Sequence, residues 1–430
     1  MSAKGRPVKA LFLVHNLPFR GSYFRALEIA RRMALRGHYV EFVHISEHKK
    51  RRPSTYSLSI EQGNSPGDIL KTALTVVESP NQTFFNDRQE GWGIFDNGFR
   101  IHHALRQRWD LVYGFSHKPD CVLPALAAKA RGAKMILDWS DWWGGREGLY
   151  QMCVLSSDGF RSLPLPLRTV RRVVFAAEAV WEPHACRIAD AVTLISGEFM
   201  SHPRAPASLA RKAFVMHSGA PLDRIRPMPK DEARAALNFA AHGIASDSIV
   251  LGYIANFHTD ERLLLEAVAS AISTGLDLHF IVAGADFERF APALHDRLMG
   301  RAHHFGRIPF EHIGHFLGAA DILLLPLSDV ALNRARYPHK LSDYAAAGRP
   351  IIACDVGETG RLLRRYDFGL PVKADPPAFA GGIIQLAARR GEWEAIGART
   401  RRTAEECFNW DKLCAGLFDF LRERLALKSL

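Results

Sequence analysis

Several features that mark common protein classes are missing from this sequence of 430 residues. Long apolar runs are absent: the stretch at residues 322–327 is among the longest, far short of the roughly 20 residues that a membrane-spanning helix needs. There is also no low-complexity tract and no short-period repeat, which argues against disordered and repeat architectures. These absences indicate an ordinary globular protein, whose contact with a membrane, if any, is at the surface.

Cysteine is scarce, and its six positions are far apart without any C-x-x-C pair. The sequence therefore carries neither a zinc signature nor a disulfide framework, and reduced thiols are expected. No other metal-ligand spacing is present, so we expect no bound metal and no cofactor. The N-terminus leads into an expected strand without the apolar core and cleavage site of a signal peptide, which predicts a cytoplasmic location.

Positive charge is in excess, since 56 Lys and Arg residues against 45 Asp and Glu residues give a net charge of +11. Such a charge attracts anions: nucleic acid, phosphorylated small molecules or the anionic face of a membrane. No recognised nucleic-acid-binding module is present, so we expect no nucleic-acid partner.

Apolar runs alternate with helix-like segments from the N-terminus onward. Residues 8–15 form a continuous apolar run, typical of a strand buried on both faces of a parallel sheet. A helical pattern over residues 23–36, stopped by Gly37, and a strand at residues 39–45 complete a βαβ unit. The same alternation predicts further elements at residues 110–115, 119–131, 134–138, 191–195 and 214–216.

A segment rich in proline and charge interrupts this pattern, after which a second series of strands and helices begins at residue 249. We therefore expect an N-terminal domain at residues 1–222, a linker at 223–246, a C-terminal domain at 247–407 and a final helix, within 408–430, that returns to the N-terminal domain. In doubly wound α/β sheets, ligands bind beyond the carboxyl ends of the strands.

The order of these segments resembles the family 4 glycosyltransferases (glycosyl transferases group 1). The likeness is carried by RGSYFRALEIARRMALRGHYVEFV, IADAVTLIS, FVMHSGAPLDRIRP, LHFIVAG, HHFGRIP and GAADILLLPL, and most densely by YPHKLSDYAAAGRPIIACDVGETGRLL. The resemblance implies the GT-B fold: α/β, with two doubly wound Rossmann-like domains facing each other across a cleft. It further implies transfer of a sugar from a nucleotide-sugar donor, bound mainly by the C-terminal domain, usually with retention and without metal.

The resemblance assigns donor-side roles to Asp343, which would accept the ribose hydroxyls, and to Lys340, which would stabilise the departing diphosphate. The alternatives are an acid that satisfies a helix dipole and a solvated lysine. The family has another acid eight residues before Asp343, where this sequence has Ala335, beside Asn333 as a further donor-binding candidate. This departure leaves the donor sugar open and motivates one alternative function, a non-catalytic protein that binds a nucleotide sugar or a partner. A nucleotide-sugar epimerase, which shares the fold and works without transfer, is a second alternative.

Three further donor-side candidates are less specific. Arg262 lies at the start of an expected helix, where a basic side chain suits a phosphate. Gly284 and Arg307 follow strands whose ends line the base pocket in the family, where backbone contacts are expected.

In the N-terminal domain, Gly21 would let backbone amides approach the diphosphate, and His117 would face the donor sugar as a catalytic residue. Asp138, Asp141 and Trp142, in ILDWSDWWGG, indicate an acceptor pocket, because aromatic rings stack on sugars. A structural turn with packed tryptophans is the alternative. If configuration were inverted, one of the two acids would be the general base, whereas in a retaining enzyme the departing phosphate can accept the proton.

Residues 159–177 hold four arginines and no acid, with valines on one helical face and Arg168, Arg171 and Arg172 on the other. Such a helix can lie in an anionic membrane interface, or it can pack its apolar face on the core. A basic run at residues 49–52 adds charge to the same domain. We therefore expect a glycan or lipid-linked acceptor, a role in cell-surface glycan or glycolipid synthesis, and a peripheral position at the inner face of the cell membrane.

Overall fold

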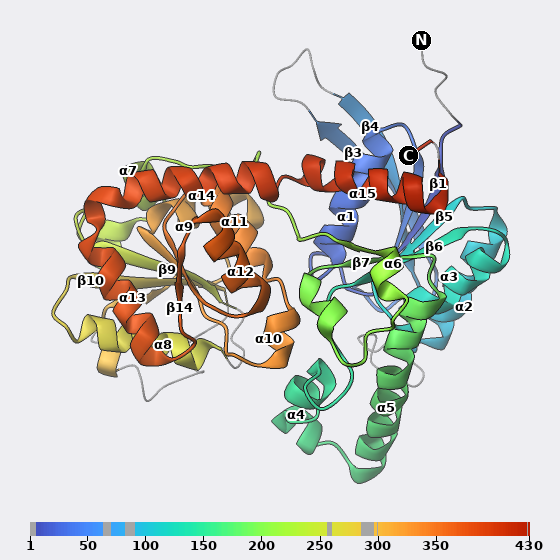
Figure 1. The fold of residues 1–430 in the computed structure, drawn as a ribbon, viewed down its shortest axis with the longest axis horizontal. Coiled ribbons are helices and arrows are strands. Elements are labelled where there is room, and N and C mark those ends of the chain that lie inside the picture. The colour runs from blue at the N-terminus through green and yellow to red at the C-terminus, as the bar shows by residue number, and fades with distance from the viewer. Residues whose placement is uncertain are drawn as a thin grey trace. The chain divides into compact units, whose positions relative to one another are not determined.

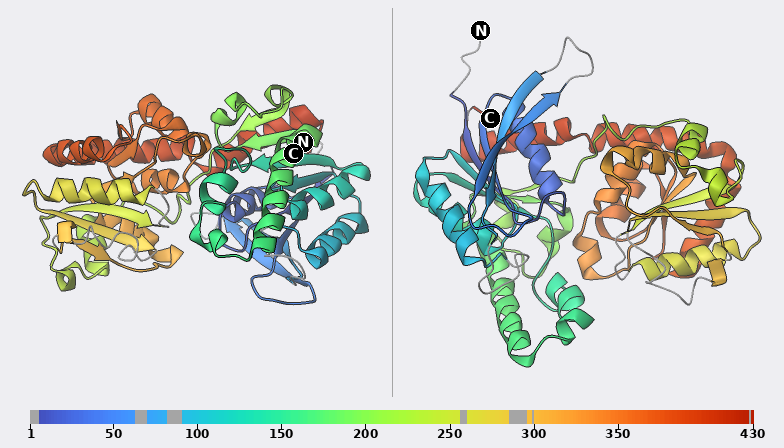
Figure 2. Two further views of the ribbon diagram at one scale, coloured as in Figure 1. Left: turned by 90° about the horizontal axis from the view of Figure 1, so that it is seen from below. Right: turned by 180° about the vertical axis from the view of Figure 1, so that it is seen from behind.

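The computed structural model describes residues 6–62, 70–81, 91–255, 260–284, 296–298, 300–427 and 429–430. The chain divides into two compact units, shown in Figures 1 and 2: unit 1, Met1–His217 with Leu413–Leu430, and unit 2, Ser218–Lys412. Each is an α/β unit built on its own sheet.

Unit 1 contains an eight-stranded sheet in the order β3-β4-β2-β1-β5-β6-β7-β8. Its strands are β1 (Lys9–Leu13), β2 (Tyr39–Ile45), β3 (Ser54–Gln62), β4 (Leu70–Ser79), β5 (Leu111–Gly114), β6 (Lys134–Trp139), β7 (Ala191–Leu194) and β8 (Ala213–Val215). The pairings are parallel except that β3 runs antiparallel to β4. The last four residues of β1 are buried, as expected for a central strand of a covered sheet.

The helices of unit 1 connect these strands: α1 (Tyr23–Leu35), α2 (Ile94–Arg106), α3 (Pro119–Ala130), α4 (Asp158–Arg161), α5 (Leu165–Ile188) and α6 (Leu209–Lys212). The first half of α5, with α4 near it, extends away from the sheet (Figures 1 and 2). The final helix, α15 (Trp410–Leu425), belongs to unit 1 from Leu413 onward.

Unit 2 has a six-stranded parallel sheet in the order β11-β10-β9-β12-β13-β14. Its strands are β9 (Ile249–Ala255), β10 (Leu278–Gly284), β11 (Ala302–His304), β12 (Ile322–Leu325), β13 (Ile351–Cys354) and β14 (Leu370–Val372). Its helices are α7 (Lys230–Ala236), α8 (Glu261–Ile272), α9 (Ile313–Ala319), α10 (Ala331–Ala335), α11 (His339–Ala347), α12 (Gly357–Tyr366), α13 (Pro376–Ala388) and α14 (Trp393–Cys407). The apolar strands and helix faces form one core.

The expected linker at residues 223–246 is wrong, because this segment folds as part of unit 2. It contains α7, whose Arg234 is buried and donates to Asp321 Oδ2 at 2.8 Å. Lys230 donates to the other oxygen of Asp321 at 2.9 Å, and Phe239 is buried nearby in sequence. The charges that suggested a solvated linker instead form ion pairs that fix α7 to the start of β12.

Within the part of the chain that the structure describes, no helix combines the length and apolar character needed to cross a bilayer.

Candidate functional site

Lys340 and Asp343 lie on α11, and the structure brings this helix against β9. The Lys340 Nζ donates to the Tyr253 hydroxyl at 3.1 Å and sits 4.4 Å from the centre of that ring. The Tyr253 hydroxyl in turn donates to Glu261 Oε1 at 2.7 Å. Burial lowers the pKa of Lys340 to about 8, against the opposing charges of Glu261 and Asp260. The lysine is thus held in place while it remains cationic at neutral pH.

Asp343 is the fifth residue of α11 and only partly exposed. Its carboxylate makes no hydrogen bond or ion pair with any described residue, and burial alone raises its pKa to about 7. The helix-dipole alternative is weak here, because that effect is confined to the first turn. A half-buried carboxyl group without a protein partner can accept hydrogen bonds from a ligand.

Asn333 and Ala335 are buried in the connection around α10. The Asn333 Nδ2 donates to Asp260 Oδ1 at 3.0 Å and to the Ser328 carbonyl at 2.9 Å, while the Ser328 amide donates to the same carboxylate oxygen at 2.7 Å. Asn333 therefore fixes the segment between β12 and α10, and a direct contact between its side chain and a donor stays a prediction.

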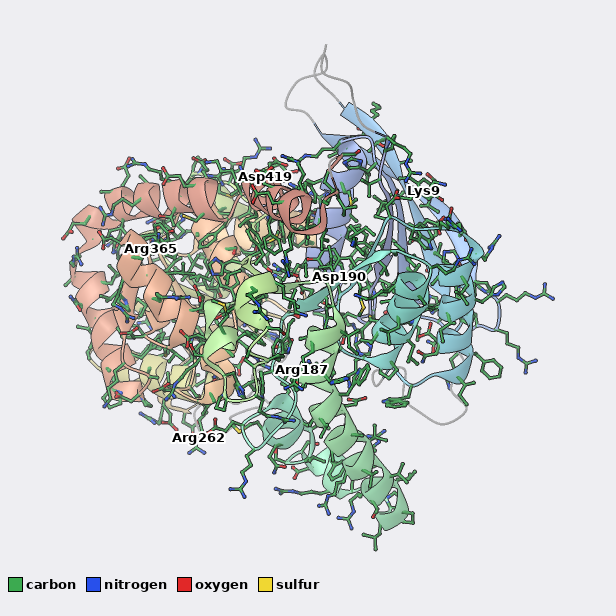
Figure 3. The ribbon with its side chains drawn as sticks, turned by 45° about the vertical axis from the view of Figure 1, so that its right-hand side comes forward. Lys9, Arg187, Asp190, Arg262, Arg365 and Asp419 are labelled. Atoms are coloured by element: carbon green, nitrogen blue, oxygen red, sulfur yellow. The ribbon has the colours of Figure 1, made fainter. Side chains whose placement is uncertain are left out.

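The other donor-side candidates make no contact with Lys340 or Asp343 among the interactions of the described residues. Arg262 is exposed over 78% of its side chain and pairs with Glu266 at 2.9 Å on its own helix, and Figure 3 shows it at the periphery of unit 2. Gly284 ends β10 with a φ of +116°, which favours glycine, and its amide donates to the Gly306 carbonyl at 2.7 Å. Arg307 is exposed. The roles proposed for these three residues stay predictions.

In unit 1, the connections that follow β1, β5 and β6 line one pocket. It brings together four of the predicted residues: Gly21, His117, Asp138 and Asp141. The full lining is His15, Asn16, Gly21, Ser22, Phe115, Ser116, His117, Asp138, Trp139, Ser140, Asp141 and Trp143. The position agrees with the rule that ligands bind beyond the carboxyl ends of parallel strands.

Trp142 does not line this pocket, so its assignment to an acceptor surface is wrong. Its side chain is buried against Trp139, Phe199 and His202, and its Nε1 donates to the Gly144 carbonyl at 2.5 Å. The neighbouring Trp143 lines the pocket instead. In the turn after β6, the Trp142 ring therefore lies in the core and the Trp143 ring lies at the pocket.

Asp138 and Gly21 both have structural functions in this pocket. Asp138 is buried, and its Oδ1 accepts from Arg25 Nε at 3.0 Å and from the Thr193 hydroxyl at 2.6 Å. Its Oδ1 is thus engaged in a buried ion pair, while its Oδ2 has no hydrogen-bond partner among the described residues. Gly21 has a φ of +50°, and a Cβ there would lie 2.7 Å from Asn16 Nδ2, so the loop before α1 requires glycine.

His117 is buried beside Tyr150, whose hydroxyl lies 3.5 Å from its Nε2. Burial, with the charges of Lys118 and His15, holds the pKa of His117 well below its usual value. The ring is therefore neutral at physiological pH, and its proposed role toward the donor sugar stays a prediction.

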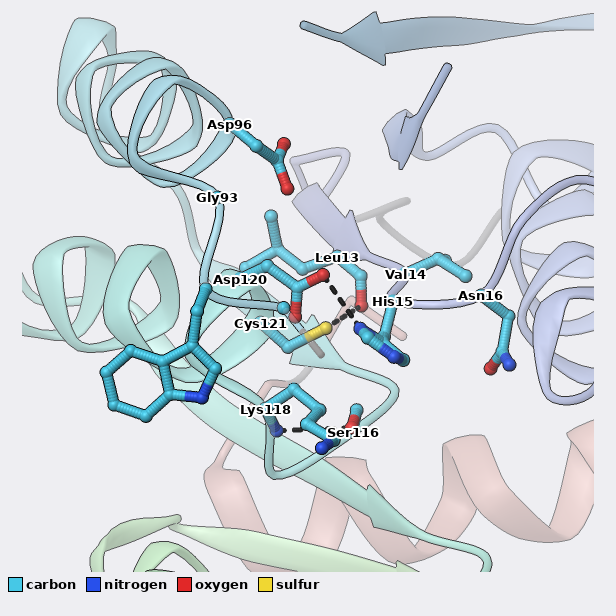
Figure 4. Close-up of polar contacts among 12 residues, drawn as sticks. Leu13, Val14, His15, Asn16, Gly93, Asp96, Ser116, Lys118, Asp120 and Cys121 are labelled. Atoms are coloured by element: carbon cyan, nitrogen blue, oxygen red, sulfur yellow. Dashed lines mark hydrogen bonds and ion pairs between the residues drawn. The ribbon is translucent and has the colours of Figure 1, made fainter. Parts of the chain in front are cut away.

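Sequence patterns missed a histidine–carboxylate pair at the same pocket, drawn in Figure 4. His15 follows β1 and its Nδ1 lies 2.9 Å from Asp120 Oδ2, on the second residue of α3. The two residues are 105 positions apart in the chain. Only the pairing of β1 with β5 brings their connections together.

Residues 248–389, within unit 2, match the family model described as glycosyl transferases group 1. This segment of the chain is similar to the group 1 glycosyltransferases. A D-inositol 3-phosphate glycosyltransferase from Rhodococcus erythropolis is 27% identical over 223 residues, which make up 49% of this chain. The alignment spans 48% of that enzyme, so the chain matches about half the length of its curated relative.

Solved structures are similar in fold over both units. Sucrose-phosphate synthase from Thermosynechococcus elongatus superposes with a TM-score of 0.69 at 18% identity, covering 98% of this chain and 100% of that one. A glycosyltransferase from Rickettsia africae gives 0.66 at 14% identity, covering 98% and 99%. Anabaena HepE in complex with UDP-glucose gives 0.64 at 13% identity, covering 96% and 100%. These likenesses confirm the predicted GT-B fold of two parallel-sheet domains.

Proposed function

We propose that the protein is a glycosyltransferase that moves a sugar, a hexose or a related one, from a nucleotide-sugar donor to a hydroxyl acceptor. The observation that carries the proposal is the pair on α11, two residues three positions apart within the segment that matches the family. Asp343 is a carboxyl group without a partner among the described residues, and Lys340 is a lysine fixed by Tyr253. The complex of HepE with UDP-glucose supports a nucleotide sugar as donor.

In this proposal, Asp343 binds the two ribose hydroxyls and Lys340 meets the diphosphate. As the bond between the sugar carbon and the phosphate oxygen breaks, negative charge grows on the leaving nucleotide. The positioned lysine stabilises that charge, an interaction that is stronger in the transition state than before it. This supply of positive charge also supports our proposal that no metal is needed, and the family resemblance supports retention of configuration.

We place the acceptor in the pocket of unit 1. Its partly exposed Asp141 and Trp143 offer a polar group and an aromatic ring, a combination suited to a sugar. Gly21 also lines this pocket, and the loop requirement for glycine keeps that position free of a side chain.

The exposed first half of α5 supports a peripheral membrane position and a lipid-linked acceptor. Val170 and Val173 are 58% and 64% exposed, so this part of the helix does not pack its apolar face on the core. Arg168, Arg171 and Arg172 lie on the same turns. Arg172 is exposed, and Arg168 and Arg171 are half-buried. Exposed apolar side chains beside basic ones suit an anionic bilayer surface, as in cell-surface glycan or glycolipid synthesis.

A panel of nucleotide sugars tests the function. Each is incubated with the protein, with and without lipid and glycan acceptors, and nucleotide release and product configuration are measured. Asp343→Asn should lose turnover, while Asp367→Asn, a matched change at an exposed site before β14, should keep it. Conversion of the donor to its epimer without nucleotide release, or binding without any turnover, would contradict the proposal.

A further inference from the structure

Glu182 is a buried acid on α5 that holds the turn after β6, and this turn forms part of the wall of the pocket of unit 1. Its Oε1 accepts from Trp139 Nε1 and from the Trp143 amide, both at 2.9 Å, and its Oε2 accepts from the Gly144 amide at 2.8 Å. Trp139 and Trp143 both line the pocket, whereas Glu182 does not. One side chain outside the lining therefore fixes two residues of it.

The turn lies directly against α5 at this point. A Cβ at Gly144 would lie 2.6 Å from the Cα of Ala179, so the close approach requires glycine. Pro183 has no amide hydrogen, which leaves the Ala179 carbonyl without the bond that a regular helix would give it. Arg204 donates to that carbonyl instead. The packing of the two backbones thus keeps Glu182 close to the turn.

The carboxylate of Glu182 forms no ion pair with any described residue. Burial raises its pKa to about 7, against its three hydrogen bonds and the charge of Arg204, which lower the pKa. The ionised form is the one that accepts all three hydrogen bonds, since a protonated oxygen becomes a donor. A buried acid without an ion pair costs stability, and groups held at such a cost are concentrated at functional sites.

The neighbours of the Trp143 ring are held by a second glutamate of α5. Glu178 accepts from Lys118 Nζ at 2.6 Å and from the Tyr150 hydroxyl. The Lys118 Nζ lies 5.0 Å from the centre of the Trp143 ring, and the centre of the Tyr150 ring lies 5.2 Å from it. Glu182 thus fixes the backbone of Trp143, while these neighbours restrict its ring.

We infer that Glu182 is a positioning residue for the acceptor, because it fixes the turn after β6 in the arrangement that places the Trp143 ring at the pocket for stacking on a sugar. This inference rests on the proposed function, which places the acceptor in this pocket. Glu182 takes part in no proton transfer. A ring that is already held in place loses little conformational freedom when a sugar stacks on it, which favours binding. Acceptor binding therefore depends on Glu182 through Trp143, whereas donor binding does not.

The test compares Glu182→Gln and Glu182→Asp with the wild type in the full-length protein. Glutamine keeps the length but replaces one accepting oxygen by a donor, and aspartate keeps the charge but is one carbon shorter. The matched control is Glu41→Gln, because Glu41 is also a buried acid of unit 1, but it pairs with His103 and does not line the pocket. The donor is the nucleotide sugar that the panel selects. The acceptors are water and the octyl glycosides of glucose, galactose and mannose.

A double-mutant cycle with Trp143→Leu separates positioning from a general loss of structure. Trp143 is half-buried and lines the pocket, so a leucine there should leave the fold intact. If Glu182 acts through the ring, Glu182→Gln has nothing further to remove once the ring is gone. A role of Glu182 in the fold alone would have the same effect with and without the ring. Thermal melts of every variant monitor the fold.

We expect Glu182→Gln to raise the KM of the octyl glycoside about tenfold. The kcat at saturating glycoside, the donor affinity in calorimetry and the hydrolysis of the donor by water should stay unchanged, because none of them requires the Trp143 ring. Glu182→Asp should raise the KM less, since it keeps the charge, and Glu41→Gln should not change it. In the Trp143→Leu protein, Glu182→Gln should cause no further rise.

Five results overturn the role of Glu182 and leave the glycosyltransferase intact. They are an unchanged KM in Glu182→Gln, an equal rise in the Trp143→Leu protein, a matching loss of donor hydrolysis, failure of both Glu182 variants to fold, and wild-type transfer to other acceptors but to none of the glycosides. A wild-type protein that turns over no nucleotide sugar with any acceptor instead overturns the proposed function, and the positioning role with it.

Discussion

Replacing Asp343 by asparagine should weaken donor binding and stabilise the fold at the same time. The side chain lies on α11 without a partner in the described structure, and burial raises its pKa from 3.8 to about 7. Asparagine keeps the shape and one acceptor oxygen but cannot carry the charge. The two effects have one cause: the protein holds an ionisable group where water solvates it poorly and no described residue pairs with it.

The stability change follows from linkage. The folded state binds the Asp343 proton up to about pH 7, whereas the unfolded chain releases it near pH 4. The free energy of unfolding therefore falls as pH rises through this window and stays low above it. At 1.36 kcal/mol per pKa unit, the full penalty is about 4 kcal/mol. Because Asp343 is partly exposed, water screens part of it, and we expect about 1–3 kcal/mol.

The binding change has the opposite sign. Ribose hydroxyls donate best to the ionised carboxylate, so affinity for a nucleoside diphosphate should rise about tenfold between pH 6 and pH 8 in the wild type. Asp343→Asn should remove this dependence and cost about 1–3 kcal/mol at pH 8, which is roughly a 5- to 150-fold increase in Kd.

Calorimetric titration with UDP and other nucleoside diphosphates at both pH values measures the affinities, and thermal melts at pH 8 and pH 4 measure the stabilities. We expect Asp343→Asn to melt higher than the wild type at pH 8 and equally at pH 4. Asp367→Asn, on the exposed side chain that ends α12, should change neither quantity. An unchanged Kd in Asp343→Asn, or a lower melting temperature at pH 8, would refute the reasoning.

Lys340→Met should lower kcat more than it raises KM, because the negative charge that the lysine meets develops as the nucleotide leaves. An unchanged kcat in steady-state kinetics would mean that Lys340 has only a structural role. Since burial lowers the pKa of Lys340 to about 8, kcat/KM should rise through pH 7 with Asp343 and fall above pH 8 as the lysine loses its proton; a profile flat from pH 6 to pH 9 would contradict both assignments. Activity should survive EDTA, and its loss with recovery on adding magnesium or manganese would count against a lysine-based site. Liposome sedimentation should require anionic lipid, weaken as salt rises, and fall when Arg168, Arg171 and Arg172 become Glu; equal binding of neutral vesicles would favour a soluble acceptor.

Apolar patterning was enough to place most of the sheet. The run at residues 249–255 coincides with β9, and residues 8–15 contain β1, because buried parallel strands consist of continuous apolar residues. The antiparallel pair β3 and β4 was not predicted, because the prediction of strands relied on continuous apolar runs, whereas β3 lies at the sheet edge and alternates polar and apolar residues. The segment 223–246 was wrongly predicted as a linker, because its charged residues suggested exposure to solvent. In the folded protein, some of these charges form buried ion pairs.

The site residues, too, could be predicted from the sequence only in part. Asp343 and Lys340 lie within one short motif on one helix, so their spacing could be read directly. Which of two adjacent tryptophans faces the pocket depends on the turn after β6, and the sequence favoured the wrong one. The contact between His15 and Asp120 depends on strand order, which no local pattern encodes.

The position of the last helix affects the order in which the two units can fold during synthesis. Unit 1 is completed by residues 413–430, in which Leu417, Phe418 and Leu421 are buried and Phe420 stacks on Phe214. Unit 2 is thus an insertion within the sequence of unit 1. During synthesis, unit 2 can finish folding first, while unit 1 must wait, with apolar surface uncovered, until its final segment leaves the ribosome. Removing a few C-terminal residues should therefore harm the N-terminal unit more than the unit that directly precedes them in the sequence.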